Sequence, residues 1–314
     1  MAVLPPDPIF CFKGDMGHIH SLCFPKNNQN ETTKLLAATE EGFVYFWNLE
    51  TNRLHYKQKM GHSIQSIHSI NNNVIIQEKS GLIQMFSVEE AAYTAQKSYQ
   101  CEGGFCKSIL LNDSCLIVPQ EKSTVDVVDL STMEKLYRLC LGEDVKVGAL
   151  MCLETYKKEG TDYLLGGYET GDVILWDLST TKKISQVKLK DHITSLTFDA
   201  QNSRGICGNA SNILEIFNID RDFKMAPKCE VTLTNDGCNV VRLRPDKKVF
   251  VVAGWDGKIR VNSWKTMRAL VVLNEHKGGV TDVQFSPDIV NYWHNNIFAA
   301  SGSDGRISLW NLYN

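Results

Sequence analysis

The hydrophobic and polar positions of this chain repeat at intervals of roughly forty residues. Each repeat has a short apolar segment, a turn residue, and a second segment in which apolar and polar residues alternate. Such alternation is typical of β-strands, because successive side chains point to opposite faces. A turn residue between two such segments predicts a β-hairpin. The seven paired segments are 34–40 with 43–49, 73–79 with 82–88, 115–121 with 124–130, 162–168 with 172–178, 204–210 with 213–219, 249–255 with 258–264, and 297–303 with 306–312.

The second segment of each repeat carries an aromatic residue, or a substitute for one, at a fixed position. Its members lie 39 to 48 residues apart, which is typical of four-stranded blades joined by variable loops. Five residues earlier stands a glycine, serine or asparagine, which tolerates the positive φ that a tight hairpin needs. The column is Trp47, Phe86, Val128, Trp176, Phe217, Asn262 and Trp310, after turn residues Gly42, Gly81, Ser123, Gly171, Asn212, Gly257 and Gly305.

Two further strands are predicted in each repeat. Segments 19–24, 193–199 and 280–286 are examples of an inner strand before the hairpin, and 52–58 and 267–273 of an outer strand after it. Four strands in each of seven repeats predict an all-β fold, a seven-bladed β-propeller in one domain spanning 1–314. The predicted units are approximately 9–50, 51–89, 90–131, 132–180, 181–220, 221–267 and 268–314.

The two ends of the chain are predicted to meet in the last blade. The seventh repeat stops at 313–314, directly after its third strand, and the alternating segment 9–12 belongs to no other repeat. We expect segment 9–12 to supply the missing strand, because a bare edge strand would offer unpaired backbone groups to other chains.

Composition favours a soluble intracellular protein that binds neither nucleic acid nor membrane. The net charge is −3, and the few basic pairs are short and lie beside acids. The N-terminus lacks the features of a signal peptide, and no apolar run has the length of a membrane helix. Ten cysteines are scattered without a CxxC pair, so reduced thiols are expected and no cofactor or metal is.

The last repeat combines His276, Ser301, Asp304 and Trp310. This set resembles the hydrogen-bonded network of the WD-repeat family, and the resemblance implies a structural role. Acyl transfer is disfavoured, because Ser301 is predicted in mid-strand and the buried indole N–H requires a partner. His18, His62 and His192 occupy the same position as His276 in other repeats. They are interpreted as packed or partly satisfied histidines and not as metal ligands, and the Glu40-Glu41 pair as solvated charge.

Two large aromatic residues are predicted in loops between second and third strands. Trp255 and Tyr168 would be costly there if merely exposed, and aromatic residues are enriched where proteins bind partners. We therefore predict protein binding at Trp255 and Tyr168, with Glu169 and Arg204 as weaker companions. Loop 287–296 carries Tyr292 and Trp293, and folding onto its own blade is favoured over a second contact site.

Stretches throughout the chain resemble the beta-like subfamily of WD-repeat proteins, whose fungal counterpart is the ASTRA-associated protein. The resemblance implies a non-catalytic adaptor that works with the TTT co-chaperone complex in the maturation of phosphatidylinositol-3-kinase-related kinases. The lengthened loop 287–296 departs from the subfamily pattern. The more discriminating stretches are GFCKSIL (104–110) and SRGICGNA (203–210), whereas GWDGKIRV within AGWDGKIRV (253–261) would fit many WD-repeat proteins. Other resembling stretches include LLGGYETGDVILWD (164–177) and RISLWNLY (306–313).

Other functions stay open at this stage. A substrate receptor of a cullin ubiquitin ligase is disfavoured, because the Trp-Asp-x-Arg signature of such receptors lacks its arginine here. A reader of modified histone peptides would use the Tyr168 and Trp255 face. A G-protein γ subunit is not expected as a partner, because only about eight residues, three of them proline, precede segment 9–12. We expect a monomer in the cytoplasm and nucleus that has no catalytic residues.

Overall fold

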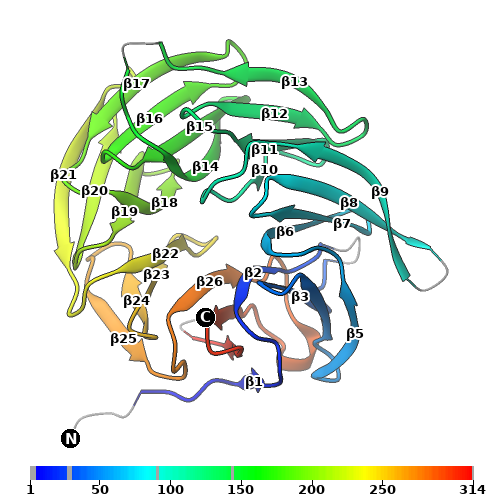
Figure 1. Cartoon of the computed structure of the whole chain (residues 1–314). Helices are drawn as coiled ribbons and strands as arrows, with labels where there is room; N and C mark the ends of the chain where they lie inside the picture. Colours follow the sequence, from blue (N-terminus) through cyan, green and yellow to red (C-terminus); the bar gives the residue numbers. More distant parts are fainter. Residues whose placement is uncertain (1–4, 27–29, 90–91, 143–144, 313–314) are drawn as a thin grey trace, which may run out of the picture. The chain divides into compact units, whose positions relative to one another are not determined.

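The computed structural model describes residues 5–26, 30–89, 92–142 and 145–312. Within these ranges the regular structure is β, apart from the 3-10 helix η1 (Asn291–Trp293). The strands form seven four-stranded sheets (Figure 1). The predicted fold, an all-β seven-bladed β-propeller, is confirmed.

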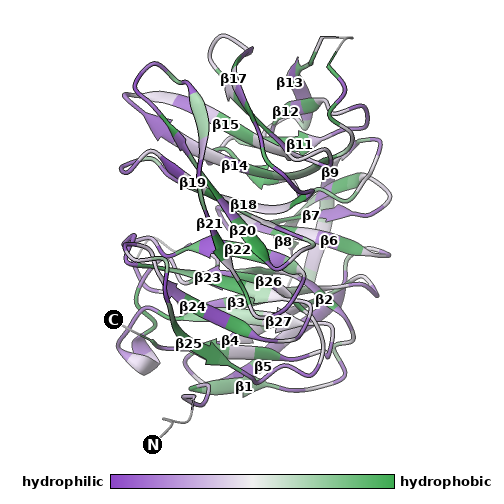
Figure 2. Cartoon of the chain, turned by 90° about the vertical axis from the view of Figure 1, so that its left-hand side faces the viewer, coloured by the Kyte–Doolittle hydropathy of each residue, from purple (hydrophilic) through white to green (hydrophobic). Residues whose placement is uncertain are grey.

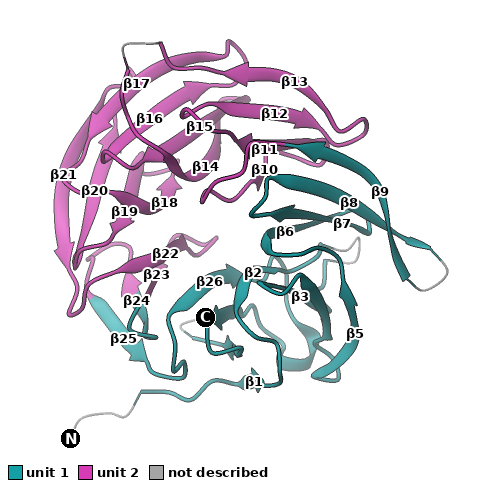
Figure 3. Ribbon diagram, in the orientation of Figure 1, with its two compact units in different colours: residues 1–100, 255–261, 269–314 teal, residues 101–254, 262–268 magenta. Residues whose placement is uncertain are grey.

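The chain divides into two compact units, which are described separately (Figure 3). Unit 1 consists of residues 1–100, 255–261 and 269–314, and unit 2 of residues 101–254 and 262–268.

Unit 1 holds three complete sheets. The first is β2(Ile19–Cys23)-β3(Lys34–Thr39)-β4(Phe43–Asn48)-β5(Arg53–Lys59), the second is β6(Ile64–Ile70)-β7(Asn73–Glu78)-β8(Leu82–Glu89)-β9(Ala92–Gln100), and the last is β1(Phe10–Phe12)-β28(Ile307–Trp310)-β27(Phe298–Gly302)-β26(Val280–Phe285).

Unit 2 also holds three complete sheets. They are β10(Ile109–Leu110)-β11(Cys115–Pro119)-β12(Val125–Asp129)-β13(Glu134–Leu139), β14(Leu150–Lys158)-β15(Thr161–Tyr168)-β16(Asp172–Asp177)-β17(Lys182–Lys188), and β18(Ile193–Asp199)-β19(Arg204–Asn209)-β20(Ile213–Ile219)-β21(Met225–Thr232). The remaining sheet is β22(Cys238–Leu243)-β23(Val249–Gly254)-β24(Ile259–Ser263)-β25(Ala269–Leu273).

The two middle strands of each sheet carry most of the core. In the first sheet β3 and β4 are buried along nearly their whole length, whereas the outer strand β5 is mostly exposed. A strand covered on both faces is apolar throughout, which explains why the middle strands were the strongest pattern in the sequence. Figure 2 shows hydrophobic residues gathered in the strands and hydrophilic residues at the turns that join them.

The hairpin turns between middle strands have the predicted backbone in six of seven blades. Gly42 has a φ of 84°, and a Cβ atom on it would lie 1.9 Å from the carbonyl oxygen of Gly61. Ser123 adopts the same region with a φ of 62°. Asn212 does not, and it instead exchanges hydrogen bonds with Leu233, directly after strand β21. The prediction of a positive φ is therefore wrong for Asn212 alone.

The N-terminal strand completes the last sheet, as predicted. Strand β1 pairs with β28, with Phe10 opposite Leu309 and Phe12 opposite Ile307. Phe12 is buried, and its ring stacks on that of Trp47 at 4.3 Å between centroids. Segment 9–12 therefore joins the last sheet and contributes to the core of the first.

Side chains of one inner strand satisfy the backbone of the next inner strand. A β-bulge in β26 leaves Thr281 outside the pairing of β26 with β27. The Thr281 hydroxyl donates to the carbonyl of Ile19 in β2, and Asp282 Oδ2 accepts from the Leu22 N–H at 2.9 Å. An edge strand has backbone N–H and carbonyl groups without partners in its own sheet. These bonds give such groups a partner where they are buried.

Unit 2 contains the same arrangement between β18 and β22. A bulge leaves Thr194 unpaired, its hydroxyl donates to the carbonyl of Cys238, and Ser195 Oγ accepts from the Val241 N–H at 2.8 Å. Thr281 with Asp282 and Thr194 with Ser195 each bind the backbone of the next inner strand. We call this contact of two successive residues the inner-strand clamp.

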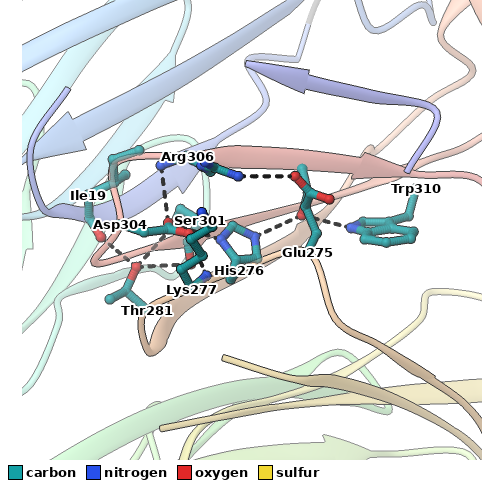
Figure 4. A network of polar contacts seen from close by, with 10 residues as sticks. Ile19, Glu275, His276, Lys277, Thr281, Ser301, Asp304, Arg306 and Trp310 are labelled. Carbon is teal, nitrogen blue, oxygen red and sulfur yellow. Dashed lines mark hydrogen bonds and ion pairs between the residues drawn. The ribbon is translucent and has the colours of Figure 1, made fainter. Parts of the chain in front are cut away.

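A buried polar network crosses the last sheet (Figure 4). His276 Nδ1 lies 3.1 Å from Asp304 Oδ1, and His276 Nε2 lies 2.8 Å from Ser308 Oγ. The indole of Trp310 donates to the same Ser308 oxygen at 2.8 Å. Because the indole can only donate, Ser308 Oγ accepts this bond, and a second lone pair and the hydroxyl proton remain for its contact with His276.

The serine of this network is Ser308, so the prediction of Ser301 is wrong. Ser301 pairs with Ile307, whereas Ala300 pairs with Ser308. Side chains alternate between the faces of a sheet, so Ser301 points away from the face that holds Ser308 and Trp310. The Ser301 hydroxyl lies 3.1 Å from that of Thr281.

Replacing Asp282 should weaken the inner-strand clamp. The variant Asp282→Ala leaves the Leu22 N–H in a buried position without its acceptor, which should cost about 1–3 kcal/mol of unfolding free energy. Asp282→Asn keeps an oxygen acceptor and should cost less. Thermal unfolding followed by circular dichroism measures both, and equal losses in the two variants would contradict the clamp.

Exchanging the two serines of the last sheet tests which one belongs to the network. Ser308→Ala leaves two buried polar atoms without a partner and should lose about 1–3 kcal/mol of unfolding free energy. Ser301→Ala should lose less, since the Thr281 hydroxyl keeps its bond to the Ile19 carbonyl. Chemical unfolding followed by tryptophan fluorescence makes the comparison, and a larger loss in Ser301→Ala would refute the assignment.

The network should make the unfolding free energy depend on pH. Burial alone would raise the pKa of Asp304, but hydrogen bonds from His276 and the Lys277 N–H lower this pKa to about 2. A carboxylate whose pKa falls on folding stabilises the protein fully above its unfolded pKa of about 3.9, and the contribution disappears as pH drops toward 2. The stability difference between wild type and Asp304→Asn should therefore shrink between pH 5 and about pH 2. A constant difference over this range would disprove the linkage.

Candidate protein-binding surface

The His276–Ser308–Asp304 arrangement does not expose a nucleophile. Ser308 is fully buried, and its hydroxyl is held between the His276 ring and the Trp310 indole. An acyl-transfer serine must reach a substrate and lie beside an oxyanion site. These three residues bond to one another and expose no nucleophile, and the structural role of the network stays a prediction.

Trp255 stands at the surface in the turn between β23 and β24. Its side chain is 52% exposed, although a tryptophan is the largest apolar residue that burial could use. The turn beneath it is tightly fixed, because Gly257 has a φ of 73° and a Cβ there would lie 2.7 Å from the His276 carbonyl oxygen. An exposed indole on a fixed turn has little conformational freedom to lose when a partner binds.

An ion pair fixes the other side of the Trp255 turn. Arg260 donates two hydrogen bonds to Asp256, at 2.7 and 3.3 Å, and its side chain is only 4% exposed. Burial alone would raise the pKa of Asp256, but the bonds from Arg260 and the Lys258 N–H lower it. Asp256 therefore stays ionised and holds the turn, while Trp255 faces outward.

The loop position predicted for Tyr168 is wrong. Tyr168 ends strand β15, and its side chain is completely buried in the core of unit 2. The ring lies over Gly166, where a Cβ would come within 3.3 Å of the phenol oxygen. Neither that hydroxyl nor the Trp176 indole nitrogen has a hydrogen-bond partner. Burial raises the pKa of Tyr168, so the phenol stays neutral. A buried ring gives a partner nothing to contact.

The two weaker candidates differ in their surroundings. Glu169 is exposed, yet its carboxylate accepts a hydrogen bond from the Ala149 N–H at 3.0 Å and so helps to order a loop. Arg204 stacks its guanidinium over Trp264 at 4.1 Å and donates to the Trp264 carbonyl at 2.8 Å. Trp264 is itself buried and donates to Asp199 at 2.6 Å. These contacts give Arg204 a packing role that its sequence context did not reveal.

Phe105 is a surface aromatic that the sequence reasoning passed over. It is 84% exposed and follows Gly103 and Gly104, both with positive φ, in a loop of unit 2. An aromatic residue placed directly after such a pair, with no strand pattern around it, was the available signal.

Loop 287–296 does not fold only onto its own blade, contrary to the favoured prediction. The Thr32 N–H donates to the Ile289 carbonyl at 2.9 Å, and the Thr32 hydroxyl donates to the Asp288 carbonyl at 3.1 Å. Val290 is fully buried in a cluster with residues of the first blade. Ile289 and Tyr292 remain 47% and 57% exposed. The loop therefore braces the first blade and also presents apolar surface.

Metal ions in proteins are commonly bound by histidine, cysteine, aspartate and glutamate. Within the described ranges, one group of three such residues has its ligand atoms close enough together to hold an ion, namely His18, His20 and Glu40. In the same ranges no helix is long and apolar enough to span a membrane.

Comparison with known proteins places the chain in a family. Residues 267–311 match the WD domain, G-beta repeat family. The chain is 31% identical over 324 aligned residues to mouse guanine nucleotide-binding protein subunit beta-like protein 1, covering 98% of this chain and 97% of that protein. It is 41% identical to the ASTRA-associated protein 1 of Schizosaccharomyces pombe over 23% of this chain and 18% of that protein. The Schizosaccharomyces japonicus counterpart is 28% identical over 54% of this chain and 48% of that protein. The chain therefore belongs to the WD-repeat family that includes guanine nucleotide-binding protein subunit beta-like protein 1 and the ASTRA-associated proteins.

Proposed function

We propose that this protein is a non-enzymatic adaptor that supports the maturation of phosphatidylinositol-3-kinase-related kinases together with the TTT co-chaperone complex. Similarity to one WD-repeat relative along nearly the whole of both chains carries the proposal. Similarity of this extent argues for a shared role more strongly than the fold does, since propellers host many functions. The partial matches to proteins named as ASTRA-associated favour work within a complex.

Trp255 is the proposed anchor for a protein partner. Aromatic residues on rigid supports contribute most of the binding energy in many interfaces, because they bury a large area at little entropic cost. The Asp256–Arg260 ion pair and the tight Gly257 turn supply that support. Phe105 is a second proposed contact residue because of its high exposure. Glu169 stays a weaker candidate.

The structure weakens the alternative that the protein reads modified histone peptides. That function requires Tyr168 and Trp255 together on one exposed face, and Tyr168 is buried. A ubiquitin-ligase receptor remains the other alternative. Recovery of cullin subunits in place of kinases or co-chaperones would favour it.

We also propose that the protein is a monomer of the cytoplasm and nucleus. It would use no cofactor and would bind no nucleic acid, membrane or G-protein γ subunit. The net charge of −3 supports the absence of nucleic-acid binding, because it provides no electrostatic attraction to phosphates.

Removing the Trp255 indole should weaken partner binding while the fold is kept. We expect Trp255→Ala, expressed at native level, to recover much less of the kinases or TTT components than wild type in affinity purification. Loss of a central aromatic anchor costs about 2 kcal/mol or more, which is roughly a thirtyfold loss of affinity. Quantitative mass spectrometry of the purified material provides the measurement.

Tyr292→Ala is the matched control, because Tyr292 is an exposed aromatic of similar accessibility in another loop. It should recover partners like wild type, and both variants should unfold at the wild-type temperature. Equal recovery by Trp255→Ala and wild type would remove Trp255 from the proposal. Absence of both kinases and TTT components from the wild-type material would remove the adaptor function itself.

A further inference from the structure

Two histidines at the start of β2 lie beside a glutamate of the following hairpin. His18 Nδ1 is 3.3 Å from Glu40 Oε2, and His20 Nε2 is 3.9 Å from Glu40 Oε1. The two imidazole rings stack at 4.4 Å between centroids. One donor atom from each of the three residues lies within 4.8 Å of the others. The backbone fixes the arrangement, since the Glu40 N–H donates to the His18 carbonyl at 2.8 Å.

A β-bulge creates this arrangement. The pairing of β2 with β3 shifts between Ile19 and Ser21, which leaves His20 as the extra residue. In the clamps, the residues at this position are Thr281 and Thr194, and both reach for a neighbouring strand. Bulges commonly redirect a side chain toward a functional site. Here the bulge carries a histidine that lies beside Glu40.

The geometry points to a binding site for a zinc-class divalent ion, with His18, His20 and Glu40 as its three protein ligands and water in the open position. Two imidazole nitrogens and one carboxylate oxygen are a ligand set that zinc uses in proteins. Ligands around a tetrahedral zinc ion lie about 3.4 Å apart, so small rotations of the three side chains bring them into place. Their side chains are 33%, 17% and 46% exposed. The Nε2 atom of His20 is itself buried, so an ion reaches it only as the surrounding side chains rotate.

Lys79 competes for the same carboxylate. Its ammonium group is 2.8 Å from Glu40 Oε1, and the lysine side chain is 45% exposed. An ion bound to Glu40 would lie next to this positive charge. Repulsion between the two charges opposes binding as long as the lysine side chain stays at Glu40 and does not rotate into solvent. Removing the Lys79 charge should therefore strengthen metal binding. A cluster that serves only as an ion pair makes no such prediction.

Titration of the purified full-length chain with zinc chloride in chelator-free buffer tests the site. Calorimetry should show one ion bound per chain, and zinc should raise the unfolding temperature of the wild type. His18→Gln and His20→Gln should each weaken binding at least about tenfold. Lys79→Gln should strengthen binding. His18 precedes the strand, so His18→Gln keeps the test valid if His20→Gln fails to fold.

His55→Gln is the matched control, because His55 is an exposed histidine of the outer strand β5. It should bind zinc like wild type. Cobalt substitution separates this site from exposed thiols such as Cys140 and Cys229, because thiolate ligands add an intense charge-transfer band and nitrogen and oxygen ligands do not. No zinc binding, unchanged affinity in His18→Gln and His20→Gln, or an equal loss in His55→Gln would overturn the assignment.

Discussion

Every sheet of this protein has an inner edge strand, and the backbone groups of that edge need partners. Between several pairs of neighbouring inner strands, side chains of one strand supply such partners to the other. Asp282 accepts from Leu22 in unit 1, and Ser195 accepts from Val241 in unit 2. Both contacts depend on a β-bulge that places two successive polar residues against the next strand. Because an unpaired buried N–H is costly, these short bonds set which sheets can lie side by side within each unit.

The buried aromatic residues pose a second requirement, and not every blade meets it. Trp310 donates its indole N–H to Ser308, which the His276–Asp304 pair orients. In the fourth blade neither the Trp176 indole nitrogen nor the hydroxyl of buried Tyr168 has a hydrogen-bond partner. A repeat can therefore keep its aromatic column without the polar partner that Trp310 has.

The features that remain for binding are those the core does not need. Trp255 is held outward by a turn that an ion pair and a glycine fix in place. The proposed metal site arises in a related way, because the bulge used for clamping in other blades carries His20 in the first blade. Adaptor and metal-binding proposals thus rest on local departures from one repeating scaffold.

The sequence by itself determined the number of repeats, the two middle strands of each, and the pairing of segment 9–12 with the last blade. Those features follow from hydrophobic alternation and turn residues, which are local properties of the chain and can be recognised in the sequence. Only the tertiary structure decided that Ser308 replaces Ser301, that Tyr168 is buried while Trp255 is exposed, and that loop 287–296 contacts the first blade. Each of these depends on the face a side chain takes or on contact between residues distant in sequence. A β-bulge adds to this, because it shifts the face of the following residues by one position.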